Sequence, residues 1–487
     1  MFHGLLFNVN VKIYSGRNAG VHRIATHLRE NNWDIEVVDF ACFWTLENLK
    51  LFCRTRISDN TKFIGFSHPF GNWSNNLEFL SSWLKENYPD ILILSGSSSF
   101  PLFDTPNIDY YITGYGEKAL DHLLKWKFNN GNPPIIKTTK DNKKIIDAVH
   151  SYPSYPHKAP TIYYEKRDFI NENEFLLIEF SRGCRFSCSF CNFPILGVKG
   201  DYTRDTDNVK DQLLHAFDNW GTTNYIVSDE TFNDYTDKII KYADVIEKLP
   251  FEPWFSGCIR ADLMISLKEQ KEHLARMRFL GHLYGIETFN HLSGKIIGKG
   301  FGPDKIKAGL IDCKNYFLKN GFYRGQISLI CGLPHESLKS INNTEKWLLE
   351  NWSDQSVMMA PLDIYTDERV RESKLSIDYE KHGYKKIDVT EKSSHYSFAT
   401  TNSKIKHMFW ENEHMDFSIA YNISEKIYDM FPLLNNYQLG QIIFDSNNRM
   451  LSLPEKINLE KAQVWASFDS NQIYINDYVS KKINYKC

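Results

Sequence analysis

Residues 175–191, FLLIEFSRGCRFSCSFC, join a short apolar run to a loop that contains three cysteines. The run FLLIEF has the length and composition of a buried β-strand, and the serine and glycine after it are typical of the turn that ends one. Cys184, Cys188 and Cys191 follow with the spacing C-x3-C-x2-C. The sequence therefore predicts three thiols on one compact loop at the carboxyl end of a strand.

This cysteine loop carries the ligands that an iron–sulfur cluster requires. Soft thiolates are the usual ligands of a 4Fe–4S cube, and three of them leave one of its irons open. An open iron can bind the amino and carboxylate groups of S-adenosylmethionine (SAM). A structural zinc ion needs four closed ligands, and the next cysteine, Cys258, is far away in sequence. Unconnected buried thiols are the other alternative, but three within eight residues of a Gly- and Ser-containing loop count against it.

Six short apolar runs follow one another between residues 174 and 365. Segments of helix length, such as 208–220 and 237–249, separate them. Alternating strands and helices favour a parallel sheet, so we expect a partial six-stranded β/α barrel with its functional groups at the carboxyl ends of the strands. The runs are FLLIEF, NYIVSDE, PWFSGCI, GHLYGIE, GQISLICG and VMMAPLDI.

Residues 1–130 alternate in the same way and predict a separate domain. The strand-like runs are HGLLFNV, DIEVVDF, KFIGFS and DILILSG. They favour a doubly wound, flavodoxin-like parallel sheet with a ligand crevice at the strand ends, near the turns at 95–97 and 114–116. Residues 131–173 are polar and rich in Pro and Tyr, as a linker is. Residues 366–487 mix charged helical and aromatic segments, and we expect a small, mainly helical C-terminal domain or lid there. The predicted fold class is α/β.

The overall composition limits the classes of partner and the compartment. The formal charge is −3, from 57 basic and 60 acidic residues, so electrostatics give no reason to expect nucleic acid or an anionic membrane. No apolar run approaches the roughly 18–20 residues that span a bilayer, and the N-terminus lacks a cleavable apolar leader. Nine cysteines, an odd and mostly scattered set, do not form a disulfide framework. We therefore expect a cytoplasmic protein.

Five segments, in order along the chain, resemble the motifs of radical SAM enzymes. They are SRGCRFSCSFCNF at 181–193, SDETFND at 228–234, IRADL at 259–263, YGIETFN at 284–290 and ISLICGLPHES at 327–337. The resemblance covers about residues 174–365. It implies a 4Fe–4S cluster on the three cysteines, SAM as the second cofactor, reductive cleavage of SAM to a 5′-deoxyadenosyl radical, and an electron donor such as flavodoxin or ferredoxin.

The same resemblance implies roles for residues on the barrel face. Phe190 would contact the adenine of SAM. The ribose, amino or carboxylate groups of SAM would be held by Arg260, Glu287 and Thr288. Adenine would pack on the fifth strand, at Ile330, Cys331 and Gly332, where the glycine allows close approach of the backbone. Arg260 and Glu287 have the alternative of serving as ion-paired barrel residues.

Asp229 and Glu230 form a carboxylate pair at the end of the second barrel strand. They are weak candidates for catalysis, either by accepting a substrate proton or by orienting SAM. The alternative is a structural role, such as capping the next helix, and we favour it. The sequence assigns no other catalytic residue.

The N-terminal domain resembles the cobalamin-binding-type domain that precedes the barrel in one group of radical SAM enzymes. TGYGE at 113–117 stands at the position of that group's Gly-Glu-Gly-Glu turn. The resemblance suggests Gly96, Ser97, Gly114 and Gly116 as cobalamin contacts. The matching loop after the first strand, VNVKIYSG at 9–16, lacks the Asp and His of an Asp-x-His-x-x-Gly motif. Cobalamin therefore binds without a protein histidine, or the domain has kept the fold and lost the cofactor.

Together these features predict a radical SAM enzyme that modifies an unactivated carbon of an organic substrate of unknown type. With cobalamin bound, the reaction would be a methylation. Without it, the alternatives are a rearrangement, a cyclisation or an oxidation. Methylthiotransfer would need a second cluster on three N-terminal cysteines, but only Cys42 and Cys53 precede the linker. A non-catalytic metal-binding protein would have no need of the SAM motifs.

Overall fold

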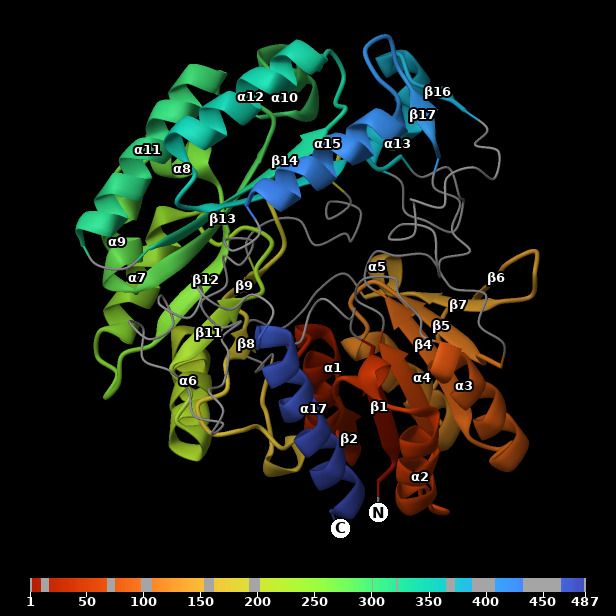
Figure 1. Cartoon of the computed structure of the whole chain (residues 1–487). Helices are drawn as coiled ribbons and strands as arrows, with labels where there is room; N and C mark the ends of the chain where they lie inside the picture. Colours follow the sequence, from red (N-terminus) through yellow and green to blue (C-terminus); the bar gives the residue numbers. More distant parts are fainter. Residues whose placement is uncertain are drawn as a thin grey trace.

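The computed structural model describes residues 2–9, 17–67, 75–97, 107–152, 162–191, 202–299, 301–320, 323–364, 373–387, 408–431 and 466–485. Within these residues the chain forms two α/β units, each built on its own parallel sheet. Figure 1 shows the N-terminal unit in red and orange and the second unit in yellow-green to cyan. The two units meet near the first strand of the second sheet.

The N-terminal sheet has the flavodoxin-like strand order β2-β1-β3-β4-β5, all parallel, which confirms the predicted fold of this domain. Four of its five strands, all but β5, are apolar runs that the sequence indicated. The five strands are β1 (Gly4–Asn8), β2 (Ile35–Val38), β3 (Phe63–Ser67), β4 (Leu92–Ser97) and β5 (Tyr110–Thr113).

Helices cover both faces of this sheet. On one face, α1 (Ala19–Glu30) and α4 (Glu117–Phe128) pack on Leu6 and its neighbours. The other face, which includes Leu5 and Phe7, is covered by α2 (Leu46–Arg56), α3 (Asn75–Asn87) and α17 (Ala466–Asn484). Successive β1 side chains thus enter opposite cores, because side chains alternate along a strand.

The sheet continues past residue 130, into the segment where we expected a linker. The strand β7 (Lys144–Asp147) pairs in parallel with β5, and β6 (Lys137–Thr138) pairs with β7 in an antiparallel hairpin. The short helix α5 (Ala148–Ser151) follows. Ile146 is fully buried and supplies the apolar contact that joins β7 to the sheet.

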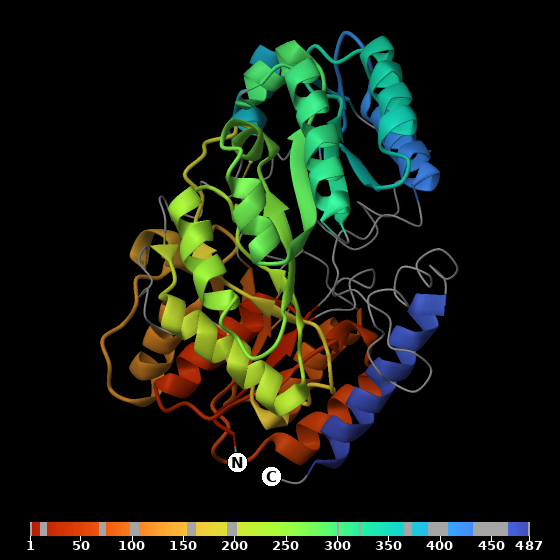
Figure 2. The ribbon, with the colours of Figure 1, turned by 90° about the vertical axis from the view of Figure 1, so that its left-hand side faces the viewer.

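The second sheet has six parallel strands in the order β15-β14-β13-β12-β11-β8, which confirms the predicted partial barrel. The strands are β8 (Leu176–Ile178), β11 (Asn224–Val227), β12 (Trp254–Ile259), β13 (Phe279–Glu287), β14 (Arg324–Cys331) and β15 (Ser356–Pro361). The outer helices are α6 (Thr206–Trp220), α7 (Thr236–Ile246), α8 (Ala261–Ser266), α9 (Gln270–Arg276), α10 (His291–Ile297), α11 (Pro303–Lys319) and α12 (Leu338–Asn351). Figure 2 shows helices of this unit in front of its sheet.

The described parts of residues 366–487 divide between the two units. The helices α13 (Lys374–Ile377) and α15 (Phe417–Met430) and the hairpin of β16 (Lys385–Lys386) and β17 (Trp410–Glu411) lie on the barrel (Figure 1). The helix α17 instead inserts Ile475, Tyr478 and Val479 into the core of the N-terminal unit. This region was expected to form one domain or lid, and the sequence pattern could not reveal which core each helix joins.

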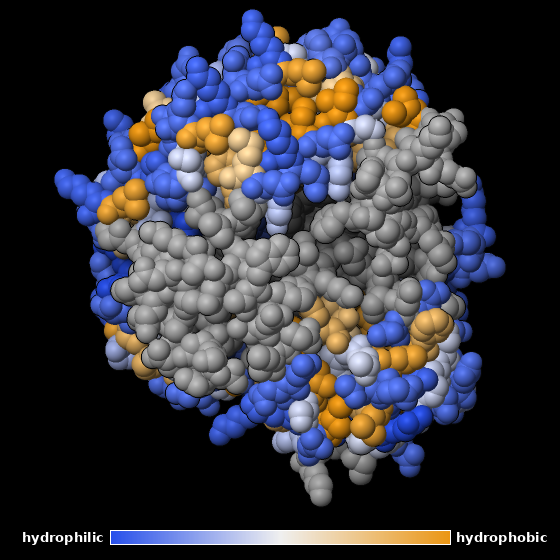
Figure 3. Space-filling model, viewed as in Figure 1, coloured by the Kyte–Doolittle hydropathy of each residue, from blue (hydrophilic) through white to orange (hydrophobic). Residues whose placement is uncertain are grey.

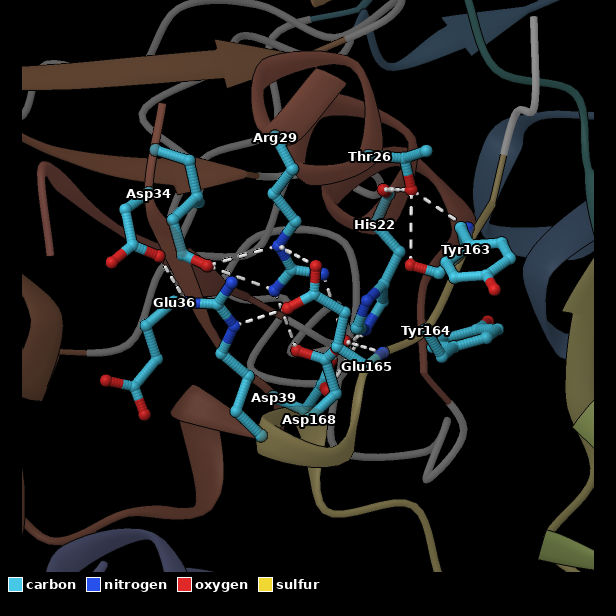
Figure 4. Close-up of polar contacts among 12 residues, drawn as sticks. His22, Thr26, Arg29, Asp34, Glu36, Asp39, Tyr163, Tyr164, Glu165 and Asp168 are labelled. Carbon is cyan, nitrogen blue, oxygen red and sulfur yellow. Dashed lines mark hydrogen bonds and ion pairs between the residues drawn. The ribbon is translucent and has the colours of Figure 1, made fainter. Parts of the chain in front are cut away.

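A buried charged cluster links the N-terminal unit to the connection that enters the barrel (Figure 4). Arg17 forms ion pairs with Asp39 at 2.5 Å and with Glu174 at 2.7 Å. Arg29 pairs with Asp168 at 3.1 Å, and that carboxylate closes the short 3-10 turn η2 (Lys166–Asp168). Burial alone would raise the pKa of Asp168, but Arg29 more than offsets this and holds that pKa well below its usual range. The cluster fixes the connection against α1 and β2.

On the face drawn in Figure 3, hydrophilic residues predominate and apolar ones gather in separate patches. Among the described helices, none is long and apolar enough to cross a membrane.

Candidate functional site

The cysteine loop begins where β8 ends. The short strand β9 (Ser181–Arg182) pairs with β10 (Tyr202–Thr203), and Gly183 then turns the chain with a φ of +97°. A side chain would strain that conformation, so glycine suits the position. Cys184, Cys188 and Cys191 follow, and all three are partly exposed. The structure thus places them at the carboxyl end of the first barrel strand, as the sequence predicted.

Neighbouring elements hold the middle of the cysteine loop through backbone hydrogen bonds. The Ser189 amide donates to the Ile297 carbonyl at 3.2 Å, and its hydroxyl donates to the Ile296 carbonyl at 3.1 Å. The Leu375 amide donates to the Ser189 carbonyl at 2.8 Å. The end of α10 and the start of α13 therefore fix the loop from two sides.

The three thiols suit a cluster better than a single ion. In the described part of the chain, no three His, Cys, Asp or Glu side chains converge where one metal ion would bind. A 4Fe–4S cube binds each thiolate to a different iron, so its cysteines stand apart, whereas structural zinc needs four converging ligands. Cys184 Sγ lies 3.5 Å from Thr231 Oγ1, and Cys188 Sγ lies 3.6 Å from Arg260 Nη1. A donor such as the Arg260 guanidinium supports a thiolate ligand.

Arg260 is tied to the cysteine loop. Its guanidinium makes two hydrogen bonds to Asp262, at 3.0 and 2.6 Å, and stacks 3.8 Å from the ring centroid of Phe186. We had expected the fork of this arginine to be available for the SAM carboxylate. Sequence reasoning missed Asp262 as its partner, although the motif IRADL contains it. Arg260 is thus ion-paired in this structure, and its contact with SAM stays a prediction.

Glu287 lies at a strained end of β13. Its φ is +65°, and the pairing of β13 with β14 shifts register between Gly285 and Glu287. Lys299 Nζ bonds the Gly285 carbonyl at 2.7 Å and the Glu287 carboxylate at 3.3 Å, and it lies 5.6 Å from the ring centroid of Phe190. Burial raises the pKa of Glu287, while Lys299 opposes that shift. Strained conformations of this kind cluster at functional sites.

A pocket opens beside these residues. It is lined in part by Asp262, Gly285, Thr288, Phe289 and Lys299. Of the predicted SAM contacts, only Thr288 is part of this lining. Lys299 was not singled out from the sequence, because its role depends on the turn of α10 that brings it back to β13.

Glu336 organises the turn after β14 and was also missed. Its carboxylate accepts hydrogen bonds from Thr288 Oγ1 at 2.8 Å, from the Gly332 amide at 2.9 Å and from the Leu333 amide at 3.3 Å. Burial raises the pKa of Glu336 to about 7. The signal was available, since this glutamate stands in the segment ISLICGLPHES.

Gly332 differs from its predicted use. Its φ is +92°, and a Cβ added there would lie 2.3 Å from the indole ring of Trp410. The Tyr384 hydroxyl donates to the Gly332 carbonyl at 2.6 Å. Trp410, from the C-terminal region, thus packs directly on Gly332, and the contact of this segment with adenine stays a prediction. Ile330 is half-buried, and Cys331 is buried in the barrel core.

The carboxylates of Asp229 and Glu230 bind the start of the cysteine loop. Asp229 accepts from the Phe180 amide at 2.9 Å and from the Ser181 hydroxyl at 2.6 Å, and burial raises its pKa to about 7. Glu230 accepts from the Gly183 amide at 3.0 Å and from the Tyr115 hydroxyl. Neither caps the next helix, α7, which begins only at Thr236. Their contacts are those of structural residues.

The glycines suggested as cobalamin contacts pack against protein. A Cβ at Gly114 would lie 2.7 Å from Val149, and one at Gly116 would lie 3.5 Å from both Ile24 and Ile112. Gly96 lies in β4, where a Cβ would be 3.4 Å from the Ile112 carbonyl oxygen. Ser97 ends the same strand, and its side chain is outside the described residues. Cobalamin contacts at these four positions stay a prediction.

Residues 178–348, which contain the cysteine loop and the strands β11, β12, β13 and β14, match the sequence profile of the Radical SAM superfamily. This part of the chain is a radical SAM domain. The resemblance found in the sequence is therefore confirmed. No curated protein matches the chain.

Solved structures similar to this radical SAM enzyme share its two-unit fold. The radical SAM methyltransferase TsrM from Kitasatospora setae, with cobalamin and a [4Fe-4S] cluster bound, has a TM-score of 0.64 at 13% identity, and the match covers 99% of both chains. TsrM with tryptophan substrate and aza-SAM gives 0.61 at 14% identity, over 80% of this chain and 79% of that one. The cobalamin-dependent enzyme OxsB with aqua-cobalamin gives 0.57 at 16% identity, over 78% and 56%. At these identities the likeness concerns the fold.

Proposed function

We propose that this radical SAM enzyme binds a 4Fe–4S cluster through Cys184, Cys188 and Cys191 and methylates an unactivated carbon of an organic substrate with the help of cobalamin. One observation carries the proposal: the carboxyl ends of the two sheets meet at the cysteine loop. The turn after β5 contacts Arg182 and Glu230, which flank that loop. A methyl carrier at the strand ends of the N-terminal sheet would thus face the barrel site.

The residues of the cysteine loop fit the proposed cluster. Three thiolates on one preorganised loop leave an iron open, and Arg260 places a donor beside the Cys188 sulfur. When bound, the cluster supplies the electron for reductive cleavage of SAM. An electron donor such as flavodoxin or ferredoxin would deliver that electron.

The neighbouring pocket is the proposed SAM site. Glu287 and Thr288 would hold polar groups of SAM, and Lys299 is a third candidate because its ammonium group lines the pocket. Phe190 and Ile330 lie outside the lining of this pocket, and their contact with the adenine stays a prediction. Arg260 would act mainly through the cysteine loop, because Asp262 already occupies its fork.

Cobalamin, in this proposal, binds without a protein histidine, since the loop at 9–16 contains none. Two solved structures of similar fold contain cobalamin, which supports the proposal that this chain binds it. A cobalamin-independent rearrangement, cyclisation or oxidation is the second candidate. The close packing of Gly114 and Gly116 against protein side chains favours it.

Visible spectroscopy distinguishes the two candidates. The full-length chain is reconstituted anaerobically with iron and sulfide, incubated with hydroxocobalamin, and desalted. The proposal predicts corrin bands that co-elute with the protein and formation of 5′-deoxyadenosine from SAM on reduction. A folded protein without corrin bands that still cleaves SAM would favour the second candidate, and failure to cleave SAM would contradict both.

A further inference from the structure

The turn at 113–117 lies between the two units and contacts the barrel with two side chains. The Tyr115 hydroxyl donates to the Glu230 carboxylate, and the Tyr115 ring lies 4.3 Å from the Arg182 guanidinium. Glu117 accepts a hydrogen bond from Arg182 at 2.8 Å. The glycines on either side of Tyr115 pack on N-terminal residues, so the turn is fixed to its own domain while Tyr115 and Glu117 face the other.

Both contacts end beside the first cluster cysteine. Arg182 and Gly183 immediately precede Cys184, and the Glu230 carboxylate accepts a hydrogen bond from the Gly183 amide at 3.0 Å. Thr231, the next residue after Glu230, lies 3.5 Å from the Cys184 sulfur. The Tyr115 hydroxyl therefore sets the position of a carboxylate that holds the backbone just before this ligand.

A buried ion cluster strengthens the same junction. Arg182 pairs with Glu179 at 2.9 Å as well as with Glu117. Glu179 also pairs with Arg23 of α1 at 2.5 Å and with Arg204 at 2.6 Å. Arg182, Glu117 and Glu179 are nearly or fully buried, at 1%, 2% and 0% exposure. Buried charges depend strongly on the position of each partner, so this cluster admits one docking geometry of the two units.

We infer that Tyr115 and Glu117 are positioning residues through which the N-terminal domain sets the geometry of the cysteine loop. The inference rests on the proposed cluster site and adds a function to the TGYGE turn. The cluster's first ligand would then be correctly placed only when the N-terminal domain is docked. Disturbing the turn would alter the cluster environment without removing a cluster ligand.

Two variants of the full-length chain test this inference. Tyr115→Phe removes the donor to Glu230 but keeps the ring over Arg182, so the fold is retained. Glu117→Gln removes one charge of the ion cluster. The matched control is Tyr152→Phe, which loses the hydrogen bond between Tyr152 and His122 inside the N-terminal domain.

Amide hydrogen exchange of the metal-free chains gives the first readout. In Tyr115→Phe we expect the peptide that contains Gly183 to exchange about fivefold faster, the factor expected for loss of an ordinary hydrogen bond. In Tyr152→Phe the exchange of this peptide should equal that of the wild type. If the Gly183 peptide exchanged at the wild-type rate in both Tyr115→Phe and Glu117→Gln, the inference would be overturned.

The electron paramagnetic resonance (EPR) spectrum of the reduced, reconstituted enzyme gives the second readout. We expect an altered or broadened cluster signal in Tyr115→Phe and Glu117→Gln, at unchanged iron content, and the wild-type signal in Tyr152→Phe. A merely stabilising contact would lower the melting temperature and leave the signal unchanged, which would also overturn the inference. If the wild type assembles no cluster, the proposed function fails, whereas the exchange experiment still tests the inference.

Discussion

Arg260 Nη1 lies 3.6 Å from the sulfur of Cys188, and Asp262 holds the arginine in that position through two hydrogen bonds. A fixed cation beside a thiolate favours the more negatively charged state of the group that the thiolate binds. Hydrogen bonds to the sulfurs are one of the factors that set the potential of an iron–sulfur cluster. We therefore expect Arg260 to make the proposed cluster easier to reduce.

Replacing Arg260 should make the cluster harder to reduce. In Arg260→Gln we expect a midpoint potential more negative than that of the wild type, because the reduced cluster loses a neighbouring positive charge. Asp262→Asn should shift the potential in the opposite direction, to a more positive value, because it removes a negative charge and leaves the arginine without its ion-pair partner. An EPR-monitored redox titration measures this. Arg276→Gln, which removes an exposed arginine paired with Asp244 and Glu247, is the control. Equal potentials in Arg260→Gln and Arg276→Gln would contradict the role.

Glu336 should make stability depend on pH. Burial raises its pKa from 4.5 to about 7, so between these values the folded chain keeps a proton that the unfolded chain releases. This contribution to stability is fully present below about pH 4.5 and is lost as the pH rises through about 7. The loss corresponds to about 1.4 kcal/mol per unit of pKa shift.

Glu336→Gln removes this titration. Urea unfolding of both proteins at pH 5 and pH 8 gives the free energy of unfolding of the wild type minus that of the variant. This difference should fall by up to about 3 kcal/mol from pH 5 to pH 8. Glu350→Gln, at an exposed position of α12, controls for the change of residue type. A stability difference between wild type and Glu336→Gln that is the same at both pH values would show that Glu336 does not titrate in this range.

The C-terminal helix α17 should contribute strongly to the stability of the N-terminal domain. Lys482 pairs with Glu36 at 2.9 Å, and both side chains are fully buried. Lys482→Ala leaves Glu36 with Arg56 as its remaining ion-pair partner, at 3.0 Å. We expect a loss of about 3 kcal/mol, the lower end for breaking a buried pair. The neighbouring Lys481, whose pair with Asp477 is exposed, provides the control: Lys481→Ala should change stability by less than about 0.5 kcal/mol. Thermal unfolding followed by circular dichroism compares them, and equal effects would contradict the proposed role of the buried pair.

The strands and the cysteine loop were predictable because their signals are local. Each barrel strand is an apolar run before a turn, and the cysteine spacing lies within one segment. The strand β7 escaped detection because KIID is short and lies in a polar, Pro-rich stretch. The attachment of α17 also escaped, since an amphipathic helix can cover either sheet.

The side-chain partnerships of the site depend on strand register and could not be derived from local patterns. Arg260 and Cys188 come from different motifs, as do Thr288 and Glu336. Trp410 reaches Gly332 from a C-terminal hairpin whose short strands carry little sequence signal. The motifs thus lie at the strand ends, as the sequence predicted, while the geometry shows which of their polar groups are already paired.

The most direct test of the account is the EPR spectrum of the reduced, anaerobically reconstituted enzyme before and after addition of SAM. We predict the signal of a reduced 4Fe–4S cluster that changes when SAM is added, because SAM binds the open iron. The same signal should be absent from the triple variant in which Cys184, Cys188 and Cys191 are replaced by alanine. A signal that SAM leaves unchanged, or one that persists in the triple variant, would contradict the assignment of these three cysteines.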